Sequence, residues 1–309
     1  MMRKYVIGVD VGGSSVKLGK FDQDGVLLDK WSFRTNKTDA GEHILPDIVK
    51  SIKRHVPTEE IKGIGIGVPG PVKDNVVVHC VNLSWGRKNL VEDLHFLLQD
   101  NEIIIKAGND ANVAAAGEMF KGVARGYKTV VMYTLGTGIG GGIVLNEELM
   151  EGVNGAGAEL GHTIVDFRHN FQCNCGKKGC LETVASATGI VNIAKEKLVR
   201  SKAKSPLRRY ENFSAKKVID YAKQGDFISR KSIEESMRYL ALAMANISLT
   251  LDPEIIVIGG GVSHAGPYLI DLIEKHFYQM VDPFIKKANI QIASLGNDAG
   301  IYGCAFLIK

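Results

Sequence analysis

The feature that most constrains this chain is a cysteine-rich segment between Glu159 and Glu182. It begins Glu-Leu-Gly-His and continues, eleven residues after the histidine, as Cys-Asn-Cys-Gly-Lys-Lys-Gly-Cys-Leu-Glu. It contains one histidine and three of the five cysteines: His162, Cys173, Cys175 and Cys180. An imidazole and three thiolates at short spacing suit a four-coordinate, tetrahedral Zn²⁺ and leave no position for a catalytic water. The segment therefore predicts a structural zinc site; free thiols, or a disulfide with one thiol left over, are the alternatives.

Length and composition indicate a two-lobed α/β protein of ordinary globular type. A chain of 309 residues is too long for one ordinary core. Hydrophobic residues make up 45% and charged residues 23%, and the net charge is only +4. No long basic run accompanies that charge, so we expect no nucleic-acid partner, although an anionic small ligand fits. With no signal peptide and no apolar run of the ~20 residues that a membrane span needs, we expect no membrane association and a cytoplasmic location.

The predicted elements repeat one order: strand, glycine turn, strand. The first copy covers residues 4–35 as three strands, and the second pairs strands at 129–135 and 143–146 around the loop GTGIGGG. This repetition predicts two related lobes around a cleft. Helices are expected at 42–55, 89–99, 110–120, 182–199, 214–224, 228–251, 267–280 and 299–307, and further strands at 61–68, 102–107, 254–263 and 289–295. The Lys- and Arg-rich stretch 202–212 is interpreted as a solvated connector without a function.

Three glycine turns follow apolar strands, at residues 10–15, 136–142 and 259–261. Glycine permits positive φ and close approach of the backbone, so that successive N–H groups can converge on an anion. Gly136, Gly138 and Gly141 match the dinucleotide fingerprint, but that loop opens a helix, whereas a strand is expected here. The Walker A ending and the protein-kinase signatures are missing. What remains is phosphate held between two hairpin turns.

Hydroxyl and carboxylate side chains flank these turns. Ser14, Thr134 and Thr137 offer hydroxyl donors to phosphate oxygens. Asp10 lies between an apolar strand and a glycine turn, where it is placed to hold Mg²⁺ through water; a carboxylate that caps the turn is the alternative.

Three carboxylates are candidates for catalysis or ligand binding. Asp110 follows Asn109 at a strand end that leads into a helix, so it is either a capping residue or a general base. Phosphoryl transfer to an alcohol needs such a group to accept the hydroxyl proton. Glu159 and Glu182 flank the zinc segment and are either solvated or aimed at sugar hydroxyls.

Together these residues make the chain resemble the ROK family of repressors and sugar kinases, and within it the ROK glucokinases. The resemblance extends from about Val6 to the C-terminus and is carried by DVGGSSVK, GIGVPGPV, VNLSW, NDAN, TLGTGIGGGIV, GAELGH, CNCGKKGCLE and IGGGVS. It implies the two-lobed actin-like ATPase (ribonuclease H-like) fold with the active site in the cleft between lobes. We expect a small lobe of residues 1–118 plus 297–309 and a large lobe of 119–296 that carries the zinc loop 159–182.

The resemblance also implies roles for individual residues. Asp110 would be the catalytic base, and His162 would bind zinc with one ring nitrogen and face the sugar with the other. Sugar hydroxyls would be held by Asn82, Asn109, Asp110, Glu159, His162 and Glu182. ATP would contact Gly8, Val9, Asp10, Val11, Gly12, Gly13, Ser14, Ser15, Lys17, Thr134, Leu135, Gly136, Thr137, Gly138, Ile139, Gly140, Gly141, Gly142, Gly260 and Gly261.

Two departures from the family pattern are mild. Ser14 stands where the family usually has Thr, which keeps the hydroxyl, and Gly108 stands where many glucokinases carry an acidic residue. The helix-turn-helix of the family's transcriptional members is also missing from this chain.

The sequence thus predicts an ATP- and Mg²⁺-dependent kinase that phosphorylates the 6-hydroxyl of glucose and contains structural Zn²⁺. N-acetylglucosamine, N-acetylmannosamine, mannose and fructose are the alternative substrates. A sugar-sensing regulator without turnover and a nicotinamide-dependent oxidoreductase are the alternatives of other classes. The family suggests a homodimer or homotetramer.

Overall fold

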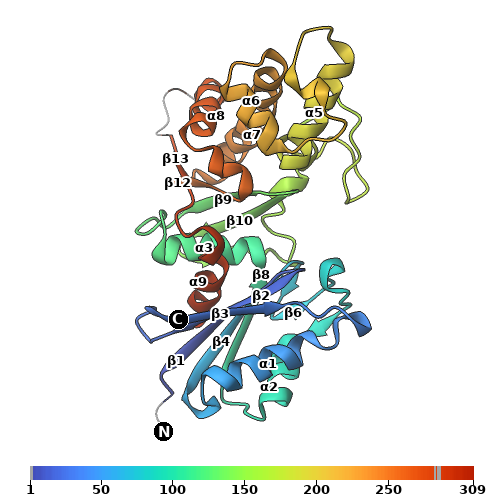
Figure 1. Ribbon diagram of the computed structural model, residues 1–309. Helices are drawn as coiled ribbons and strands as arrows, with labels where there is room; N and C mark the ends of the chain where they lie inside the picture. Colours follow the sequence, from blue (N-terminus) through green and yellow to red (C-terminus); the bar gives the residue numbers. More distant parts are fainter. Residues whose placement is uncertain (1–2, 282, 284–286) are drawn as a thin grey trace. The chain divides into compact units, whose positions relative to one another are not determined.

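The computed structural model describes residues 3–281, 283 and 287–309, and within them the chain forms two compact units (Figure 1). Unit 1 comprises Met1–Lys128, Gly142–Ala158 and Ser294–Lys309, and unit 2 comprises Thr129–Gly141 and Glu159–Ala293. Each unit has its own helices, and most strands belong to two five-stranded sheets.

Unit 1 is built on a mixed five-stranded sheet in the order β3-β2-β1-β4-β8. β1 pairs antiparallel with β2, and β2 with β3, while β1, β4 and β8 run parallel. The strands are β1 (Tyr5–Val11), β2 (Ser15–Phe21), β3 (Leu27–Arg34), β4 (Ile61–Val68) and β8 (Ile104–Asn109). The helices of unit 1 are α1 (Ile44–His55), α2 (Leu90–Leu98), α3 (Asp110–Lys121) and α9 (Ala299–Phe306).

Successive side chains of β1 point to opposite faces of this sheet, as the two-residue period of a strand requires. Ile7 and Val9 pack in the larger core with α1 and α2, which lie together below the sheet in Figure 1. Val6 belongs to the smaller core with α9. Gly8 also faces α9, because a Cβ there would lie only 2.1 Å from the Ile301 carbonyl oxygen. Close packing of α9 therefore accounts for this glycine of the predicted nucleotide site.

The same close approach joins α9 to α3. A Cβ on Gly303 would lie 1.5 Å from the carbonyl oxygen of Val113, and one on Gly117 would lie 2.2 Å from that of Ala299. The two helices can cross at this distance only because both positions lack a side chain.

Residues 142–158 pack on unit 1, so the unit boundaries differ from the lobe boundaries expected from the sequence. The amide of Ile143 donates to Asn112 Oδ1, and Gly142 lies against the backbone of Ala111. Gly155 lies against Val72. Val72 belongs to a small antiparallel sheet that the sequence analysis did not predict. That sheet consists of β5 (Val72–Lys73), β6 (Val76–Val77) and β7 (Lys88–Asn89).

The second five-stranded sheet has the order β11-β10-β9-β12-β13. β12 runs parallel to both β9 and β13, and every residue of β12 is buried. Its strands are β9 (Val130–Leu135), β10 (Ile139–Leu145), β11 (Glu148–Leu149), β12 (Ile255–Gly259) and β13 (Asn289–Ile292). The helices of unit 2 are α4 (Glu182–Ala185), α5 (Ala187–Arg200), α6 (Ala215–Lys223), α7 (Phe227–Leu251) and α8 (Pro267–Met280). The long α7 packs against α5, α6 and α8.

Three expectations about unit 2 were wrong in detail. β10 begins at Ile139, so the glycines at 140–142 lie in a strand and the turn is limited to 136–138. The helix expected at 182–199 is broken at Ser186, whose hydroxyl caps α5 by accepting the Gly189 amide. The stretch 202–212 is not wholly solvated, because Leu207 is buried within a short 3₁₀ turn.

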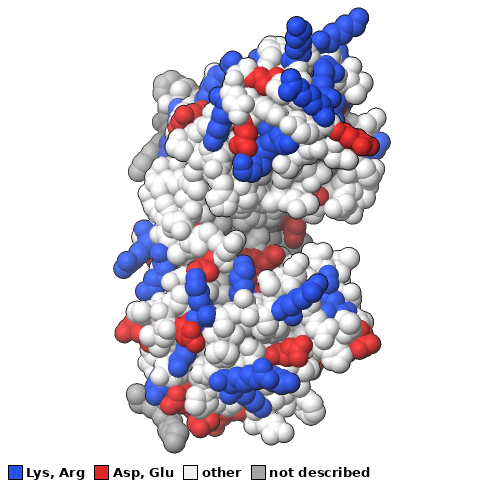
Figure 2. Space-filling model, viewed as in Figure 1, with Lys and Arg blue, Asp and Glu red and all other residues white. Residues whose placement is uncertain are grey.

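Figure 2 shows Lys and Arg side chains interspersed with Asp and Glu over unit 1 on the face in view. Within the described part of the chain, no helix combines the length and the apolar character that crossing a membrane requires.

Candidate active site and metal centre

The cysteine-rich segment folds as a narrow loop that brings its four predicted ligands together. Two antiparallel β-bridges, Ile164 to Cys180 and Gln172 to Lys178, join the two sides of the loop. The Leu181 amide also donates to the Thr163 carbonyl. The loop turns at Gly176 and Gly179, which have φ of 86° and 82°. Such values favour glycine, so these two residues make the turn possible. We call residues 159–182 the metal loop.

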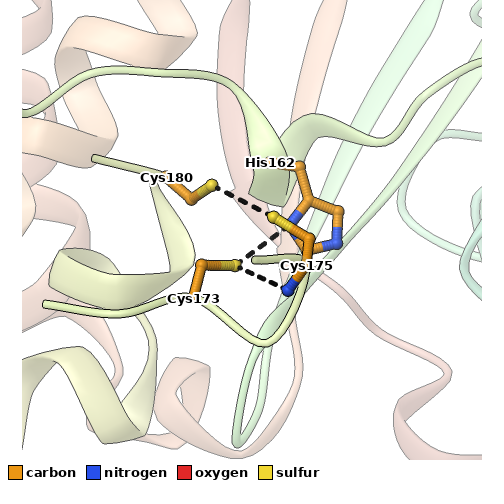
Figure 3. A group of neighbouring side chains, drawn as sticks. All are labelled: His162, Cys173, Cys175 and Cys180. Carbon is orange, nitrogen blue, oxygen red and sulfur yellow. Dashed lines mark hydrogen bonds between the residues drawn. The ribbon is translucent and has the colours of Figure 1, made fainter. Parts of the chain in front are cut away.

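The four side chains in Figure 3 have the donor set and spacing of a structural zinc site. One ligand atom from each of His162, Cys173, Cys175 and Cys180 lies within 4.8 Å of the others. His162 Nδ1 is 3.5 Å from Cys173 Sγ, and the sulfurs of Cys175 and Cys180 are 3.6 Å apart. Zn–S bonds of about 2.3 Å in a tetrahedron place sulfurs about 3.8 Å apart, so a zinc ion fits this cluster. All three cysteines are free thiols, which removes the disulfide alternative.

The surroundings shift the thiol pKa values in opposite directions. Burial and then the Glu182 carboxylate raise the pKa of Cys173. Burial also acts to raise the pKa of Cys175, but the Lys177 amide and the neighbouring thiols outweigh it and lower that pKa overall. Zinc binds thiolates, so metal binding must displace the Cys173 proton.

His162 separates the cysteines from one of the two flanking carboxylates. Its Nδ1 faces Cys173 and lies 3.9 Å from Glu182 Oε1, while its Nε2 lies 3.9 Å from Glu159 Oε2. Glu182 Oε1 is also 2.9 Å from Cys173 Sγ. With Nδ1 toward the metal position, the Nε2 edge and Glu159 are left for a ligand. The expected contact of His162 with a sugar stays a prediction.

The second glycine turn lies directly against Glu182. A Cβ on Gly138 would lie 2.4 Å from Glu182 Oε2. The start of α5 fixes the turn, because the Ala187 amide donates to the Gly136 carbonyl and Thr188 Oγ1 donates to that of Thr137. A predicted phosphate turn and a predicted sugar carboxylate are therefore neighbours within unit 2.

The third glycine turn contacts the end of β9, the strand that leads into the second glycine turn. Gly260 has a φ of 82°, and a Cβ there would lie 2.6 Å from the backbone of Leu135. Among the glycines proposed for ATP, all of which the structure describes, only Gly260 adopts a positive φ. Packing space accounts for Gly8, Gly138 and Gly142 instead.

The first glycine turn, in unit 1, has a charged pair beside it. Asp10 is 3.6 Å from Lys17 Nζ, which also donates to the Asn297 carbonyl. Burial raises the pKa of the Asp10 carboxyl, and Lys17 offsets part of that rise. Asp10 also lies against Gly300 of α9, where a Cβ would be 2.7 Å from its carboxyl carbon. A partly desolvated carboxylate of this kind suits a bound cation.

Asn109 is the N-cap of α3. Its Oδ1 accepts from the amides of Ala111 and Asn112, and its Nδ2 donates to the Gly70 carbonyl. Asp110 is the first residue of α3, and its Oδ1 lies 2.7 Å from the Ala111 amide. The helix thus has a cap without Asp110.

A pocket beside the first glycine turn was missed in the sequence analysis. It has a volume of about 450 Å³ and is lined by Arg34, Thr35, Asn36, Lys37 and Thr38. Thr35 supports the turn, because its Oγ1 donates to the Gly12 carbonyl and its amide donates to that of Ser14. The strand register contained the signal: Ser15 pairs with Arg34, so the end of β3 must lie at the turn.

The predicted site residues divide between the units, each of which brings its own set together. Unit 1 holds Gly8–Ser15, Lys17, Asn82, Asn109, Asp110 and Gly142. Asn82 is exposed in a short 3₁₀ turn, and its Cβ is 3.9 Å from the position of a Cβ on Gly13. Unit 2 holds Thr134–Gly141, Glu159, His162, Glu182, Gly260, Gly261 and the four zinc ligands.

Comparison with known proteins assigns the family. The sequence profile of the ROK family matches residues 6–309. The chain belongs to the ROK family. It is 39% identical to a glucokinase of Halalkalibacterium halodurans, with 100% of this chain and 96% of that protein covered, and 35% identical to a glucokinase of Thermotoga maritima, with 100% and 98% covered.

A solved ROK structure extends this likeness to the fold. The crystal structure of a ROK family glucokinase from Streptomyces griseus in complex with glucose and AMPPNP is 31% identical. It aligns with a TM-score of 0.77 over 98% of both chains. ROK sugar kinases have the two-lobed actin-like ATPase fold, so the expected fold class is confirmed.

Proposed function

We propose that this ROK protein is an ATP-dependent glucose kinase that phosphorylates the sugar 6-hydroxyl. The observation that carries the proposal is the position of Glu182, which adjoins Gly138 of a phosphate turn on one side and the metal-loop residues Cys173 and His162 on the other. A kinase needs a sugar-binding group and a phosphate-binding turn at this proximity. The glucokinase relatives and the neighbour that contains glucose and AMPPNP support the same activity.

Asp110 is the group proposed to accept the proton of the reacting hydroxyl. Because Asn109 caps α3, the Asp110 carboxylate is not needed to begin the helix. Asn82, Asn109, Glu159, His162 and Glu182 are proposed to hold the other hydroxyls, which fixes the orientation of the sugar.

The three glycine turns are proposed to bind ATP, with the phosphates at the first two turns and the nucleoside near Gly260 and Gly261. Asp10, paired with Lys17, would hold Mg²⁺ through water, and the metal would neutralise charge on the phosphates. A zinc ion held by the metal loop would stabilise its shape, because four protein ligands leave no position from which to polarise a sugar.

The test is turnover by the purified full-length protein with Mg·ATP and a panel of sugars. We expect the highest kcat/KM with glucose, against N-acetylglucosamine, N-acetylmannosamine, mannose and fructose. Glucose binding in calorimetry without ATP consumption would instead identify a sugar-sensing regulator. Reduction of a nicotinamide cofactor without ATP would identify an oxidoreductase.

We also propose a cytoplasmic homodimer or homotetramer. Phe167 on the metal loop is 91% exposed and Phe96 on α2 is 82% exposed, and aromatic residues are enriched in subunit interfaces. Five cysteines without a disulfide are typical of proteins in a reducing compartment. A monomer in sedimentation at micromolar concentration would contradict the assembly, and recovery of the protein outside the cytoplasmic fraction would contradict the location.

A further inference from the structure

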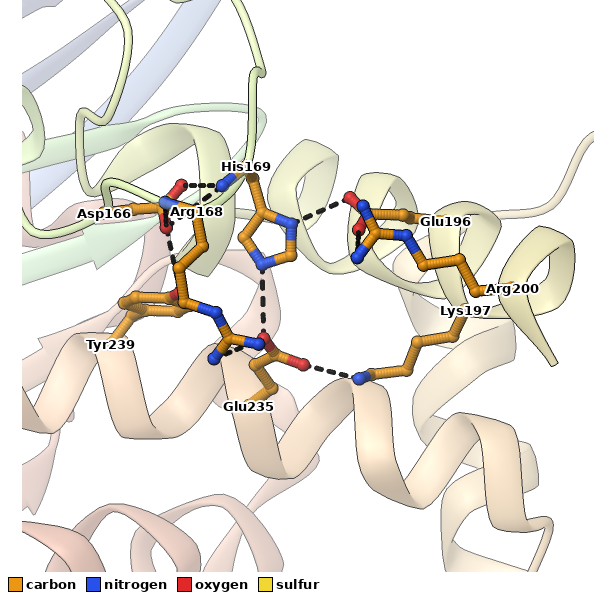
Figure 4. A network of polar contacts seen from close by, with 8 residues as sticks. All are labelled: Asp166, Arg168, His169, Glu196, Lys197, Arg200, Glu235 and Tyr239. Atoms are coloured by element: carbon orange, nitrogen blue, oxygen red, sulfur yellow. Dashed lines mark hydrogen bonds and ion pairs between the residues drawn. The ribbon is translucent and has the colours of Figure 1, made fainter.

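His169 fastens the middle of the metal loop to two helices of unit 2 (Figure 4). Its side chain is only 6% exposed. Nδ1 lies 2.7 Å from Oε2 of Glu196 on α5, and Nε2 lies 3.2 Å from Oε1 of Glu235 on α7. None of these three side chains is among the predicted site residues or metal ligands.

Both ring nitrogens of His169 face carboxylates, so each nitrogen can act as a hydrogen-bond donor. Carboxylates only accept hydrogen bonds, so the imidazole donates from both nitrogens when it is protonated. The ring also stacks on Phe171 with centroids 5.0 Å apart and meets the edge of Tyr239. Charge-assisted hydrogen bonds in such a partly buried setting are stronger than those on the surface.

Cations from α5 hold both carboxylates in place. Lys197 pairs with Glu235, and Arg200 pairs with Glu196 at 2.8 Å. Burial acts to raise the pKa of the Glu235 carboxyl, but Lys197 and His169 outweigh it and lower that pKa overall. Lys197 and His169 thus favour the charged form of the Glu235 carboxyl, which accepts the stronger hydrogen bond.

Asp166 adds a second contact to the same helix. Its Oδ1 accepts from the Tyr239 hydroxyl at 2.9 Å, and its carboxylate also accepts from the amides of Arg168 and His169. The Asp166 amide donates to the Gly179 carbonyl across the loop. Gly179 directly precedes the zinc ligand Cys180, so the anchored segment lies next to the metal cluster in the hairpin.

The anchor and the phosphate turn share α5 as their support. Ala187 and Thr188 at the start of α5 hold the Gly136–Gly138 turn, and Glu196 on the same helix holds His169. Any tilt of the metal loop on α5 would therefore move Glu182 relative to that turn.

We propose that His169, supported by Asp166, is a positioning residue that orients Glu182 and His162 toward the sugar and acts as a second anchor of the metal loop beside the zinc. The part that concerns sugar rests on the proposed function. The part that concerns the loop does not, so the two can fail separately.

The test compares His169→Phe with wild-type protein. Phenylalanine keeps a ring that can stack on Phe171 but removes both hydrogen bonds, each of the charge-assisted kind. We expect glucose KM to rise about 10-fold, with KM for Mg·ATP and kcat changed less than about 3-fold. Zinc content should stay at the wild-type level, while zinc transfer to a chromogenic chelator, measured without substrate, should be about 10-fold faster.

Two further variants separate positioning from general damage. Lys216→Ala removes an exposed i,i+4 ion pair with Asp220 on α6, outside the His169 network, and should behave as wild type. His169→Gln keeps N–H donors and should give glucose KM and zinc-release values between those of wild type and His169→Phe. If His169→Phe does not fold, Glu196→Leu removes the acceptor for Nδ1 from the α5 side and leaves the imidazole in place.

Wild-type glucose KM and zinc-release rate in His169→Phe would overturn the proposal. Equal rises in both KM values with a lower kcat would also overturn it, since they indicate general loosening of the fold. If the wild-type protein phosphorylates no sugar but the variant still releases zinc faster, the proposed function fails and the anchor stands.

Discussion

At two positions of the candidate site, the identity of a residue is explained by the side chain next to it. Asn109 caps α3, and its neighbour Asp110 is the proposed base. Gly138 lacks a side chain where Glu182 needs room. In both cases the neighbouring residue explains the choice of amino acid, and each gives a test by single substitution.

Asp110→Asn keeps the size of the side chain and removes the proton acceptor. We expect kcat to fall by about 10²- to 10⁴-fold, the usual contribution of a positioned general base, while glucose affinity changes little. Steady-state kinetics and calorimetry measure the two quantities. Asp47→Asn, in the first turn of α1, is the matched control. An Asp110→Asn enzyme with more than half of the wild-type kcat would exclude Asp110 as the base.

Gly138→Ala places a methyl group 2.4 Å from Glu182 Oε2, so the carboxylate must move. From the sequence alone, a substitution in this turn is expected to affect ATP and spare glucose. The contact with Glu182 changes that prediction, and we expect the KM values for glucose and ATP to rise together. Gly86→Ala, where a Cβ would meet nothing within 4 Å, is the control. Unchanged glucose KM would show that Glu182 does not bind the sugar.

At the scale of elements, helices held at close distance support the site residues. In unit 1, α9 approaches both the sheet and α3, and it carries Gly300, which adjoins Asp10. In unit 2, α5 holds the second glycine turn at one end and the metal loop farther along. The spacing of site residues within each unit therefore depends on how closely helices can approach.

Gly303→Ala tests this dependence in unit 1. Its Cβ would lie 1.5 Å from the Val113 carbonyl, so α9 and α3 must separate. Overpacking of this kind typically costs about 1–3 kcal/mol, and we expect at least that loss in the free energy of unfolding measured in urea. Because α3 begins with Asp110, kcat should also fall. Stability equal to that of the Gly86→Ala control would mean that the helix contact tolerates a side chain.

At the scale of the whole molecule, the two units contain different parts of the machinery. The metal loop, with all its predicted ligands, belongs to unit 2, whereas Asp10 and Asp110 belong to unit 1. The free energy of zinc binding therefore stabilises unit 2 directly. This gives a prediction that a separate measurement on each unit can check.

Cys175→Ala should release zinc, loosen the metal loop and raise glucose KM. Elemental analysis measures the metal. In hydrogen exchange we expect faster exchange in residues 159–200, while residues 5–68 of unit 1 exchange as in wild type. Wild-type protein that is prepared without chelator and is fully active without zinc would contradict the metal assignment. A zinc-free variant with unchanged glucose KM would refute the link between metal and sugar site.

The sequence by itself determined the features whose residues lie close together along the chain. The zinc ligands, the glycine turns and the Asn109-Asp110 pair could be predicted because short spacing and turn chemistry bring such residues together whatever the rest of the chain does. Most helices and strands were also predicted, because periodicity is a local signal. The family, recognised from the same motifs, was confirmed.

Tertiary structure decided the contacts between residues far apart in sequence. Gly138 meets Glu182, Gly303 meets Val113, and His169 meets Glu235. Spacing along the chain carries no information about these pairs, because they depend on how closely packed elements approach one another. Packing likewise assigned residues 142–158 to unit 1, through Gly142 and Ile143 against α3. The local patterns thus identified the chemical groups, and close packing determined which of them are neighbours.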